Sequence, residues 1–348
     1  MCIRDRNSNS LVVSNIKQET VDSVVVSFKT EGETKSTYKF KAGQYLTLCS
    51  KIKGEQIKRS YSICSDPQSG KLQIGVKAIK NGVYSNYIND ALRVGDTIEV
   101  SVPEGRFVLD KSPANYLAFA AGSGITPIIS IASDELKKNS NSIFVLGYGN
   151  KTLGSSMFKD ALSDLKKEFP NRFFVHNTYS QENNPNSSFG RIDSGFINQV
   201  LKQNYSIDFE KVLLCGPEKM IQSATELLKD KSFNENQILF ELFYSEASEK
   251  TIVSSKNSKA TIIYDDETLS LEVPKNMTIL DAALQKNIDV PYSCQGGVCS
   301  SCIAKVSSGS ASMLQNNILT DSEIEEGLVL TCQAVPKTQE ITVDFDDV

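Results

Sequence analysis

The chain has 348 residues, of which 40% are hydrophobic and 23% charged, with a formal net charge of −5 at pH 7. This length suffices for two or three domains, and no apolar run reaches the roughly 18 residues of a membrane-spanning helix, so we expect no membrane partner. Eight cysteines without a secretory signal favour metal or redox chemistry in the cytoplasm over structural disulfides. The single histidine, His176, excludes a Rieske cluster, and the lack of a basic stripe with interleaved aromatic residues argues against a nucleic-acid partner.

The first part of the chain has the pattern of a β-barrel. Residues 1–10 (MCIRDRNSNS) are polar and are expected to be a foreign or disordered leader. From residue 11 to residue 110, short β-rich runs alternate with turn residues, which predicts a small antiparallel β-barrel. The expected strands are LVVSNI (11–16), SVVVSF (23–28), STYKF (36–40), QYLTL (44–48), KLQIGV (71–76) and DTIEVSV (96–102).

The pattern changes between residues 111 and 243 to strands that alternate with helices. Such alternation predicts a doubly wound α/β domain, in which helices cover both faces of a parallel sheet. The expected strands are YLAFAA (116–121), SIFVLGY (142–148), FFVHNTY (173–179), KVLLCG (211–216) and ILFELF (238–243). Helical spacing of apolar residues marks SSMFKDALSDLKKEF (155–169) and PEKMIQSATELLKD (217–230).

A third part follows a Ser- and Lys-rich stretch. Residues 244–258 are expected to be a linker. In residues 259–348, ATIIYDDETLSLEV (260–273) predicts a hairpin and TILDAALQKN (278–287) a short helix. This part holds five lysines, no arginine and fourteen aspartates and glutamates. Its acidity indicates either a docking surface for a basic partner or an ordinary solvated surface.

Four cysteines in this third part have the spacing of metal ligands. Cys294, Cys299 and Cys302 follow a C-x4-C-x2-C pattern, and Cys332 lies thirty residues further on. Structural zinc sites usually combine two CxxC-like pairs, whereas this spacing is that of plant-type 2Fe-2S clusters. Gly296 and Gly297 between the ligands allow the chain to wrap closely around a cluster. The pattern therefore predicts a 2Fe-2S cluster rather than zinc or disulfides.

Several motifs resemble those of the ferredoxin–NADP reductase superfamily. Residues 259–348 resemble a plant-type ferredoxin domain, which has the α+β (β-grasp) fold, in the segments PYSC, MLQNNIL and GLVLTCQA. Three segments of the first part resemble the superfamily's flavin motifs: RSYS (59–62), NGVYSNYI (81–88) and PEGRF (103–107). The resemblance implies that Arg59 pairs with the pyrophosphate of FAD, that Tyr61 stacks on its ring system and that Ser62 hydrogen-bonds near N5. It also places Ser60, Val76, Lys77, Gly82, Val83 and Ser85 at the flavin.

A glycine-rich turn marks the nucleotide site. AGSGITP (121–127) follows an expected strand, and its GxGxxP form resembles the superfamily's nucleotide loop. CGP (215–217), followed by Met220, is a second superfamily mark and implies that Cys215 lies near the nicotinamide. The nucleotide-site residues implied are Gly122, Ser123, Gly124, Ile125, Thr126, Pro127, Cys215, Gly216, Pro217 and Met220. Phe243 resembles the aromatic residue that faces the flavin; the alternative is a core residue.

The choice of nicotinamide depends on the end of the second strand of the α/β domain. NAD enzymes commonly carry an acidic residue there, whereas this strand ends GYGNKT, with Asn150 and Lys151. A lysine at this position suits the 2′-phosphate of NADPH. We therefore expect NADPH, with NADH as the alternative and FMN as an alternative to FAD.

The order of the three domains resembles that of reductase components of multicomponent oxygenases. YGNK and GRID favour the phenylacetyl-CoA epoxidase reductases, and the reductases of Rieske-type ring-hydroxylating oxygenases and of steroid hydroxylases are alternatives. The resemblance implies an NAD(P)H-dependent oxidoreductase with Tyr61, Ser62 and Cys215 as catalytic residues. Electrons are expected to leave through the cluster to an oxygenase component. An alternative of another class is a non-catalytic electron carrier or redox sensor.

Overall fold

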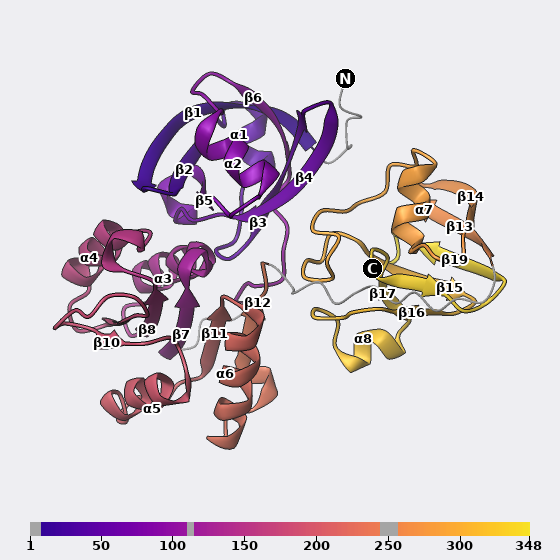
Figure 1. Ribbon diagram of the computed structural model, residues 1–348. Coiled ribbons are helices and arrows are strands. Elements are labelled where there is room, and N and C mark those ends of the chain that lie inside the picture. The colour runs from indigo at the N-terminus through magenta and orange to yellow at the C-terminus, as the bar shows by residue number, and fades with distance from the viewer. Residues whose placement is uncertain (1–7, 110–114, 244–256) are drawn as a thin grey trace. The chain divides into compact units, whose positions relative to one another are not determined.

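The computed structural model describes residues 8–109, 115–243 and 257–348 (Figure 1). Contacts divide these residues into two compact units, one that ends at Phe243 and one formed by residues 257–348. The expected linker therefore lies mostly outside the described residues, as do residues 1–7 of the expected leader. Among the described residues, no helix is both long and apolar enough to cross a membrane.

The first unit begins with a six-stranded antiparallel sheet of order β4-β3-β6-β1-β2-β5. The strands are β1 (Ser8–Thr20), β2 (Ser23–Phe28), β3 (Tyr45–Ile52), β4 (Glu55–Ser62), β5 (Leu72–Lys77) and β6 (Thr97–Ser101). Alternate side chains such as Leu46, Leu48, Ile74 and Val76 fill the interior. The predicted barrel is confirmed. The predicted leader is too long, because Ser8 to Ser10 pair with β6.

One predicted strand of the barrel is wrong. Residues 36–40 do not form a strand, because the chain is helical in α1 (Glu33–Thr37). The hydroxyl groups of Ser36 and Thr37 both donate to the carbonyl of Glu33, at 2.8 and 3.1 Å. Such local side-chain hydrogen bonds favour a turn over a strand. A second helix, α2 (Val83–Asp90), follows β5, and the 3-10 helix η1 (Pro67–Ser69) precedes β5.

The predicted doubly wound domain is also confirmed. Its six strands are all parallel, in the order β10-β9-β8-β7-β11-β12. They are β7 (Asn115–Ala121), β8 (Ile143–Asn150), β9 (Phe173–Tyr179), β10 (Ser188–Phe189), β11 (Lys211–Cys215) and β12 (Ile238–Glu241). The helices are α3 (Ile125–Lys138), α4 (Lys159–Glu168), α5 (Ser194–Gln203) and α6 (Glu218–Asp230), with 3-10 turns η2 (Gly122–Gly124), η3 (Leu153–Ser155) and η4 (Glu235–Gln237).

Helices cover both faces of this sheet (Figure 1). Alternate residues of β7 point to opposite faces, because side chains alternate along a strand. Tyr116 and Ala118 share one core cluster with residues of α3 and α4, whereas Phe119 packs edge-on against Phe196 of α5. The strand order reverses between β7 and β11, so their carboxyl ends form the switch point where ligands bind in such sheets.

The second unit is a mixed sheet with the strand order β14-β13-β19-β15-β17 and a separate pair β16-β18. Its strands are β13 (Ser258–Tyr264), β14 (Glu267–Val273), β15 (Ile303–Ser308), β16 (Ala311–Met313), β17 (Leu328–Leu330), β18 (Ala334–Pro336) and β19 (Glu340–Asp344). The predicted hairpin is β13–β14, and the predicted helix is α7 (Ile279–Gln285); α8 (Asp321–Glu325) follows the cysteine loop. First and last strands pair in parallel, as in the expected ferredoxin-like fold.

Candidate functional site

The RSYS motif lies at the carboxyl end of β4. Arg59 is exposed, and its Nη1 donates to the neighbouring Lys58 carbonyl, at 2.7 Å. Ser60 Oγ lies 3.0 Å from Thr47 Oγ1. The Tyr61 ring lies 6.2 Å from that of Tyr84 between centroids, and burial raises the pKa of Tyr61 well above its usual value. A flat, neutral aromatic face and an exposed guanidinium next to it suit a ring system with a phosphate tail.

The second predicted flavin motif forms a tight turn at the start of α2. A Cβ on Gly82 would lie 2.5 Å from Ser85 Oγ, so a larger residue here would displace the Ser85 hydroxyl. Ser85 Oγ accepts from the Ile79 backbone N–H at 3.2 Å, while Val83 is exposed. Close packing of the turn and the backbone N–H groups that begin α2 fit a phosphate group.

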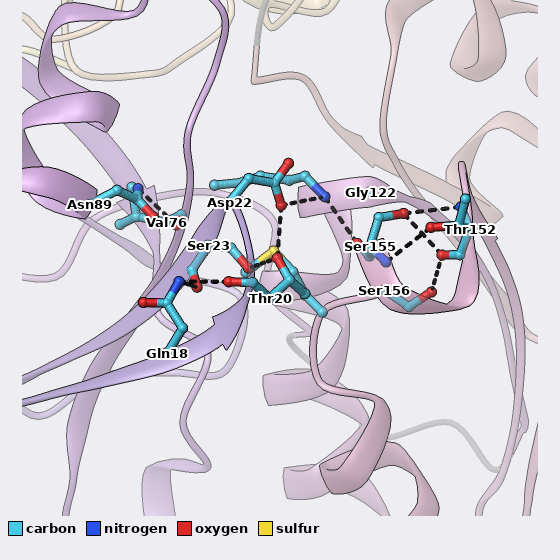
Figure 2. Close-up of polar contacts among 12 residues, drawn as sticks. Gln18, Thr20, Asp22, Ser23, Val76, Asn89, Gly122, Thr152, Ser155 and Ser156 are labelled. Carbon is cyan, nitrogen blue, oxygen red and sulfur yellow. Dashed lines mark hydrogen bonds and ion pairs between the residues drawn. The ribbon is translucent and has the colours of Figure 1, made fainter. Parts of the chain in front are cut away.

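Lys77, which the resemblance places at the flavin, contacts the nucleotide domain through its ammonium group. Figure 2 shows Asp22 and Ser155, the two residues that this group joins. Lys77 Nζ donates to the carbonyl of Ser155 at 2.9 Å and lies 3.4 Å from Asp22 Oδ1. Val76, the preceding residue, is buried, and its carbonyl accepts from Asn89 Nδ2 at 3.4 Å. The Lys77 ammonium thus joins the barrel to the segment that follows β8.

That segment is internally braced. A capping box joins Thr152 and Ser155, and Ser156 Oγ also donates to the Thr152 carbonyl, at 3.1 Å (Figure 2). Just before it, Asn150 is buried and Lys151 is exposed at the carboxyl end of β8. The carbonyls of both residues accept hydrogen bonds from backbone N–H groups beyond β9. The Lys151 side chain is therefore presented to solvent from a rigid loop.

The glycine-rich turn and the CGP motif are in direct contact. A Cβ on Gly124 would lie 2.2 Å from the Cys215 carbonyl oxygen, so the two motifs pack as closely as backbone allows. Gly122 has φ +57°, and Gly216 packs against Met220 and Ala121. Ser123 accepts a hydrogen bond on its carbonyl from Thr126 Oγ1 at 3.0 Å. The remaining predicted residues are buried Ile125 and Pro127, which begin α3, and exposed Pro217, which precedes α6.

A buried acid that the sequence analysis missed lies between the two halves of the site. Glu241 ends β12, next to Cys215 in the register of β11, and its Oε2 accepts a 3.0 Å hydrogen bond from Ser62 Oγ. Burial raises the pKa of Glu241 to about 8, against a smaller lowering effect of the Ser62 hydrogen bond. Burial also raises the pKa of the Cys215 thiol well above its usual value. The site thus holds a buried carboxyl whose neutral form is favoured by its surroundings.

The ELF tripeptide (241–243) holds the one signal that points to this residue. Glu241 is the only charged side chain in the apolar run ILFELF, an unusual place for an acid with no function or partner. Phe243, predicted to face the flavin, lies two residues beyond the end of β12 and is 40% exposed. An exposed aromatic side chain two residues after Glu241 is compatible with a stacking role and argues against a core residue.

The four predicted cluster ligands gather in the second unit. Hydrogen bonds from the thiols of Cys299 and Cys332 lower the pKa of Cys294, and one from Cys332 lowers that of Cys302. None of the four is in a disulfide, and all but Cys294 are buried. Gly296 N–H donates to Cys294 Sγ at 3.3 Å. Four adjacent thiols with backbone donors fit the donor set of a 2Fe-2S cluster. Across the described residues, the four thiols included, no group of three or more His, Cys, Asp or Glu side chains already has the geometry of a metal site.

Comparisons with known families agree with this division of the chain. An oxidoreductase FAD-binding domain matches residues 10–109, and an oxidoreductase NAD-binding domain matches residues 119–226. A 2Fe-2S iron-sulfur cluster binding domain matches residues 262–337. Together with the fold, these matches define a flavin- and NAD(P)H-dependent oxidoreductase with a 2Fe-2S cluster.

Similar proteins specify the class further. A component of 1,2-phenylacetyl-CoA epoxidase from Escherichia coli (strain K12) is 37% identical over 97% of this chain and 98% of its own length. The ferredoxin reductase component of 3-ketosteroid-9-alpha-monooxygenase from Mycobacterium tuberculosis is 31% identical over 89% of this chain and 86% of its own. The solved structure of phthalate dioxygenase reductase aligns with a TM-score of 0.64 and 25% identity over 98% of this chain and 99% of that one. The chain belongs to the family of 2Fe-2S-containing reductase components of oxygenase systems.

Proposed function

We propose that this chain carries electrons from NADPH, through FAD and a 2Fe-2S cluster, to an oxygenase component of the phenylacetyl-CoA epoxidase kind. The observation that carries the proposal is that Ser62 of the flavin motif is hydrogen-bonded to Glu241 at the carboxyl end of β12, which pairs with Cys215 at the carboxyl end of β11. Bound FAD supplies hydride acceptance and release of single electrons, and the cluster supplies one-electron transfer. The protein supplies position, exclusion of water and proton control.

The residues of the barrel have separate roles in this proposal. The Arg59 guanidinium and the turn at Gly82, Val83 and Ser85 hold the flavin phosphates, because both offer N–H donors. Tyr61 supplies an aromatic face for the ring system, and Ser60 braces β4 through Thr47. Ser62 orients its hydroxyl by donating to Glu241. The structure involves Lys77 in domain packing, so we assign it to the nucleotide loop rather than to FAD.

The nucleotide domain binds NADPH at its switch point. The turn from Gly122 to Pro127 offers backbone N–H groups at the start of α3 to the pyrophosphate. Cys215 and Gly216, with Met220 behind them, form the floor against which the nicotinamide lies. The Lys151 ammonium selects the 2′-phosphate, since it is exposed on a braced loop with no acid in the GYGNKT segment.

Cys294, Cys299, Cys302 and Cys332 hold the cluster in this proposal. We take residues 11–110, 111–243 and 259–348 as the flavin, nucleotide and ferredoxin domains, joined by residues 244–258. Four thiolates must remain reduced to bind iron, which favours the cytoplasm as the location. The acids of the ferredoxin domain, Glu325 and Glu326 among them, steer a basic patch on the oxygenase.

The test is an anaerobic visible-absorbance titration of the iron-reconstituted holoprotein with NADPH and, separately, with NADH. Bleaching of both flavin and cluster bands by NADPH at lower concentrations than by NADH is the expected result. Bleaching of the flavin alone would overturn internal transfer to the cluster. Absence of a flavin band would favour the electron-carrier alternative.

A second candidate partner is the oxygenase of a steroid hydroxylase, favoured by the 31% identity with the 3-ketosteroid-9-alpha-monooxygenase reductase component. Reconstitution distinguishes the two. Turnover with the purified oxygenase component of phenylacetyl-CoA epoxidase, and none with a steroid hydroxylase oxygenase, supports the first proposal. The reverse result supports the second.

A further inference from the structure

The side chain of Gln333 is hydrogen-bonded to the predicted cluster loop. Gln333 follows Cys332, and only 2% of its surface is exposed. Its side-chain Nε2 donates to the carbonyl of Gln295 at 3.1 Å and to Cys332 Sγ at 3.6 Å. One buried amide group therefore contacts both the loop that carries three predicted ligands and the sulfur of the fourth.

The segment that Gln333 contacts has an unusual backbone. Gln295, next to Cys294, has φ +54°, a region that side chains other than glycine rarely adopt. Gly297 has φ +70°, and a Cβ there would lie 3.0 Å from Gln333 Cγ and 3.3 Å from the Gln315 carbonyl oxygen. Such a conformation persists only where surrounding contacts enforce it. The amide of Gln333 supplies one such contact, and its aliphatic stem fills the space that Gly297 leaves.

The backbone of Gln333 is itself held firmly. Its N–H donates to the Leu330 carbonyl at 2.8 Å, and its carbonyl accepts from the Leu314 N–H at 2.9 Å. The side chain thus extends from a fixed backbone, and its Nε2 group points at the Gln295 carbonyl and Cys332 Sγ rather than at solvent. A buried, directed N–H group near a ligand sulfur stabilises additional negative charge on that sulfur.

We propose that Gln333 is a positioning residue that holds the left-handed turn at Gln295 and raises the reduction potential of the cluster. Reduction adds one electron to the cluster, and its extra negative charge spreads onto the ligand sulfurs. A hydrogen bond to Cys332 Sγ stabilises the reduced form more than the oxidised form, since hydrogen bonds to the sulfurs set the potential of such clusters. This inference rests on the proposed ligation by the four cysteines.

The experiment measures the midpoint potential of the cluster in holoprotein carrying Gln333→Met or Gln333→Glu. Methionine keeps the volume and removes both donors, whereas glutamate keeps the length and replaces the donor with an acceptor. The matched control is Gln339→Leu, because Gln339 is exposed in the same domain. Iron and flavin content, the flavin potential and the iron–sulfur stretching bands in the resonance Raman spectrum are recorded with each variant.

In Gln333→Met we expect the equilibrium constant for cluster reduction to fall about three- to tenfold. A tenfold fall corresponds to a midpoint potential lower by about 59 mV, because one electron is transferred. In Gln333→Glu the equilibrium constant for cluster reduction should fall at least as far. The flavin potential should stay unchanged in both variants, and the cluster potential should stay unchanged in Gln339→Leu. An unshifted potential in a variant with full iron content would overturn the proposal. Loss of the cluster from both variants would overturn the tuning role and leave a purely structural one. Absence of a cluster from the unmodified protein would instead refute the proposed ligation.

Discussion

Ser62 Oγ donates a 3.0 Å hydrogen bond to Glu241 Oε2, although the two residues lie 179 positions apart in the chain. Ser62 ends the flavin-motif strand β4, and Glu241 ends β12 of the nucleotide sheet. The bond therefore joins the two domains at the point where the predicted hydride donor and acceptor meet. Because both residues are buried, the pair is held without competition from water.

Ser62→Ala should weaken both stability and catalysis. Removing the hydroxyl leaves the buried carboxyl without this hydrogen bond, at a cost of about 1–3 kcal/mol. We expect a lower melting temperature for the first unit and about tenfold slower flavin reduction at saturating NADPH, because a loss of about 1.4 kcal/mol corresponds to a factor of ten. Stopped-flow absorbance under anaerobic conditions measures the rate. Ser14→Ala, an exposed serine of β1, serves as the control, and an unchanged rate in Ser62→Ala would refute the role.

Glu241→Gln should remove a pH dependence of stability. The folded-state pKa of Glu241 is raised, from 4.5 to about 8, chiefly by burial. Between these values the unfolded chain releases a proton that the folded chain retains, so the wild type loses stability as pH rises through this window. Glutamine is neutral throughout and lacks this loss.

The measurement is the difference in melting temperature between wild type and Glu241→Gln at several pH values. We expect the melting temperature of the wild type to fall by several degrees relative to that of the variant between pH 5 and pH 8. Each 1 kcal/mol of stability changes the melting temperature of a unit of this size by about 2–4 °C. Above pH 8 the difference should level off. A constant difference across the range would show that Glu241 is ionised in the folded protein.

Short local patterns sufficed to predict most of the fold. Short β-rich runs between turn residues marked the strands of the barrel, and strand–helix alternation marked the parallel domain. The strand predicted at residues 36–40 was wrong because hydroxyl groups of Ser36 and Thr37 bond back to Glu33, a preference that apolar spacing does not report. Ser8 to Ser10 were excluded because their polar composition resembles a leader, whereas pairing with β6 depends on residues about 90 positions away.

The site was less accessible to sequence reasoning where it depends on contacts between domains. The motifs located Ser62 and Cys215, but the acid between them comes from a strand that carries no motif. Lys77 was assigned to the flavin by resemblance, and only the folded chain shows its contact with Ser155. Gly124 was correctly expected in a tight turn, yet its partner, the Cys215 carbonyl, is visible only in the structure.

Lys77→Met should weaken NADPH binding without loss of FAD. Methionine keeps the aliphatic stem but removes the ammonium that joins Asp22 to the Ser155 carbonyl. Because the Lys77 side chain is 22% exposed, we expect a modest rise in KM for NADPH, about three- to tenfold, with kcat nearly unchanged. Lys77→Arg should restore most of the affinity, and exposed Lys80, changed to Met, is the control. Release of FAD from Lys77→Met would restore the original assignment to the flavin.

Lys151→Ala should reduce the preference for NADPH over NADH. The exposed ammonium contributes a charge-assisted contact to a 2′-phosphate, and NADH has no such group. We expect kcat/KM for NADPH to fall about five- to tenfold and that for NADH to remain within twofold, in line with the energy of one charged hydrogen bond. Steady-state kinetics with an artificial electron acceptor measures both. The control is Lys202→Ala, on α5; an unchanged ratio in Lys151→Ala would show that NADPH is selected elsewhere.

Cys299→Ser should abolish the 2Fe-2S cluster and leave the flavin in place. Serine is a harder and less acidic ligand than a thiolate, so a four-thiolate site loses iron when one sulfur is replaced. We expect iron content to fall to a small fraction of wild type, while NADPH still reduces the bound flavin and electron transfer to the oxygenase stops. Cys49→Ser provides the control, because Cys49 lies in β3 of the barrel, outside the ferredoxin domain. If Cys299→Ser retained full iron content and the cluster's visible absorbance, the assignment of Cys299 as a ligand would be incorrect.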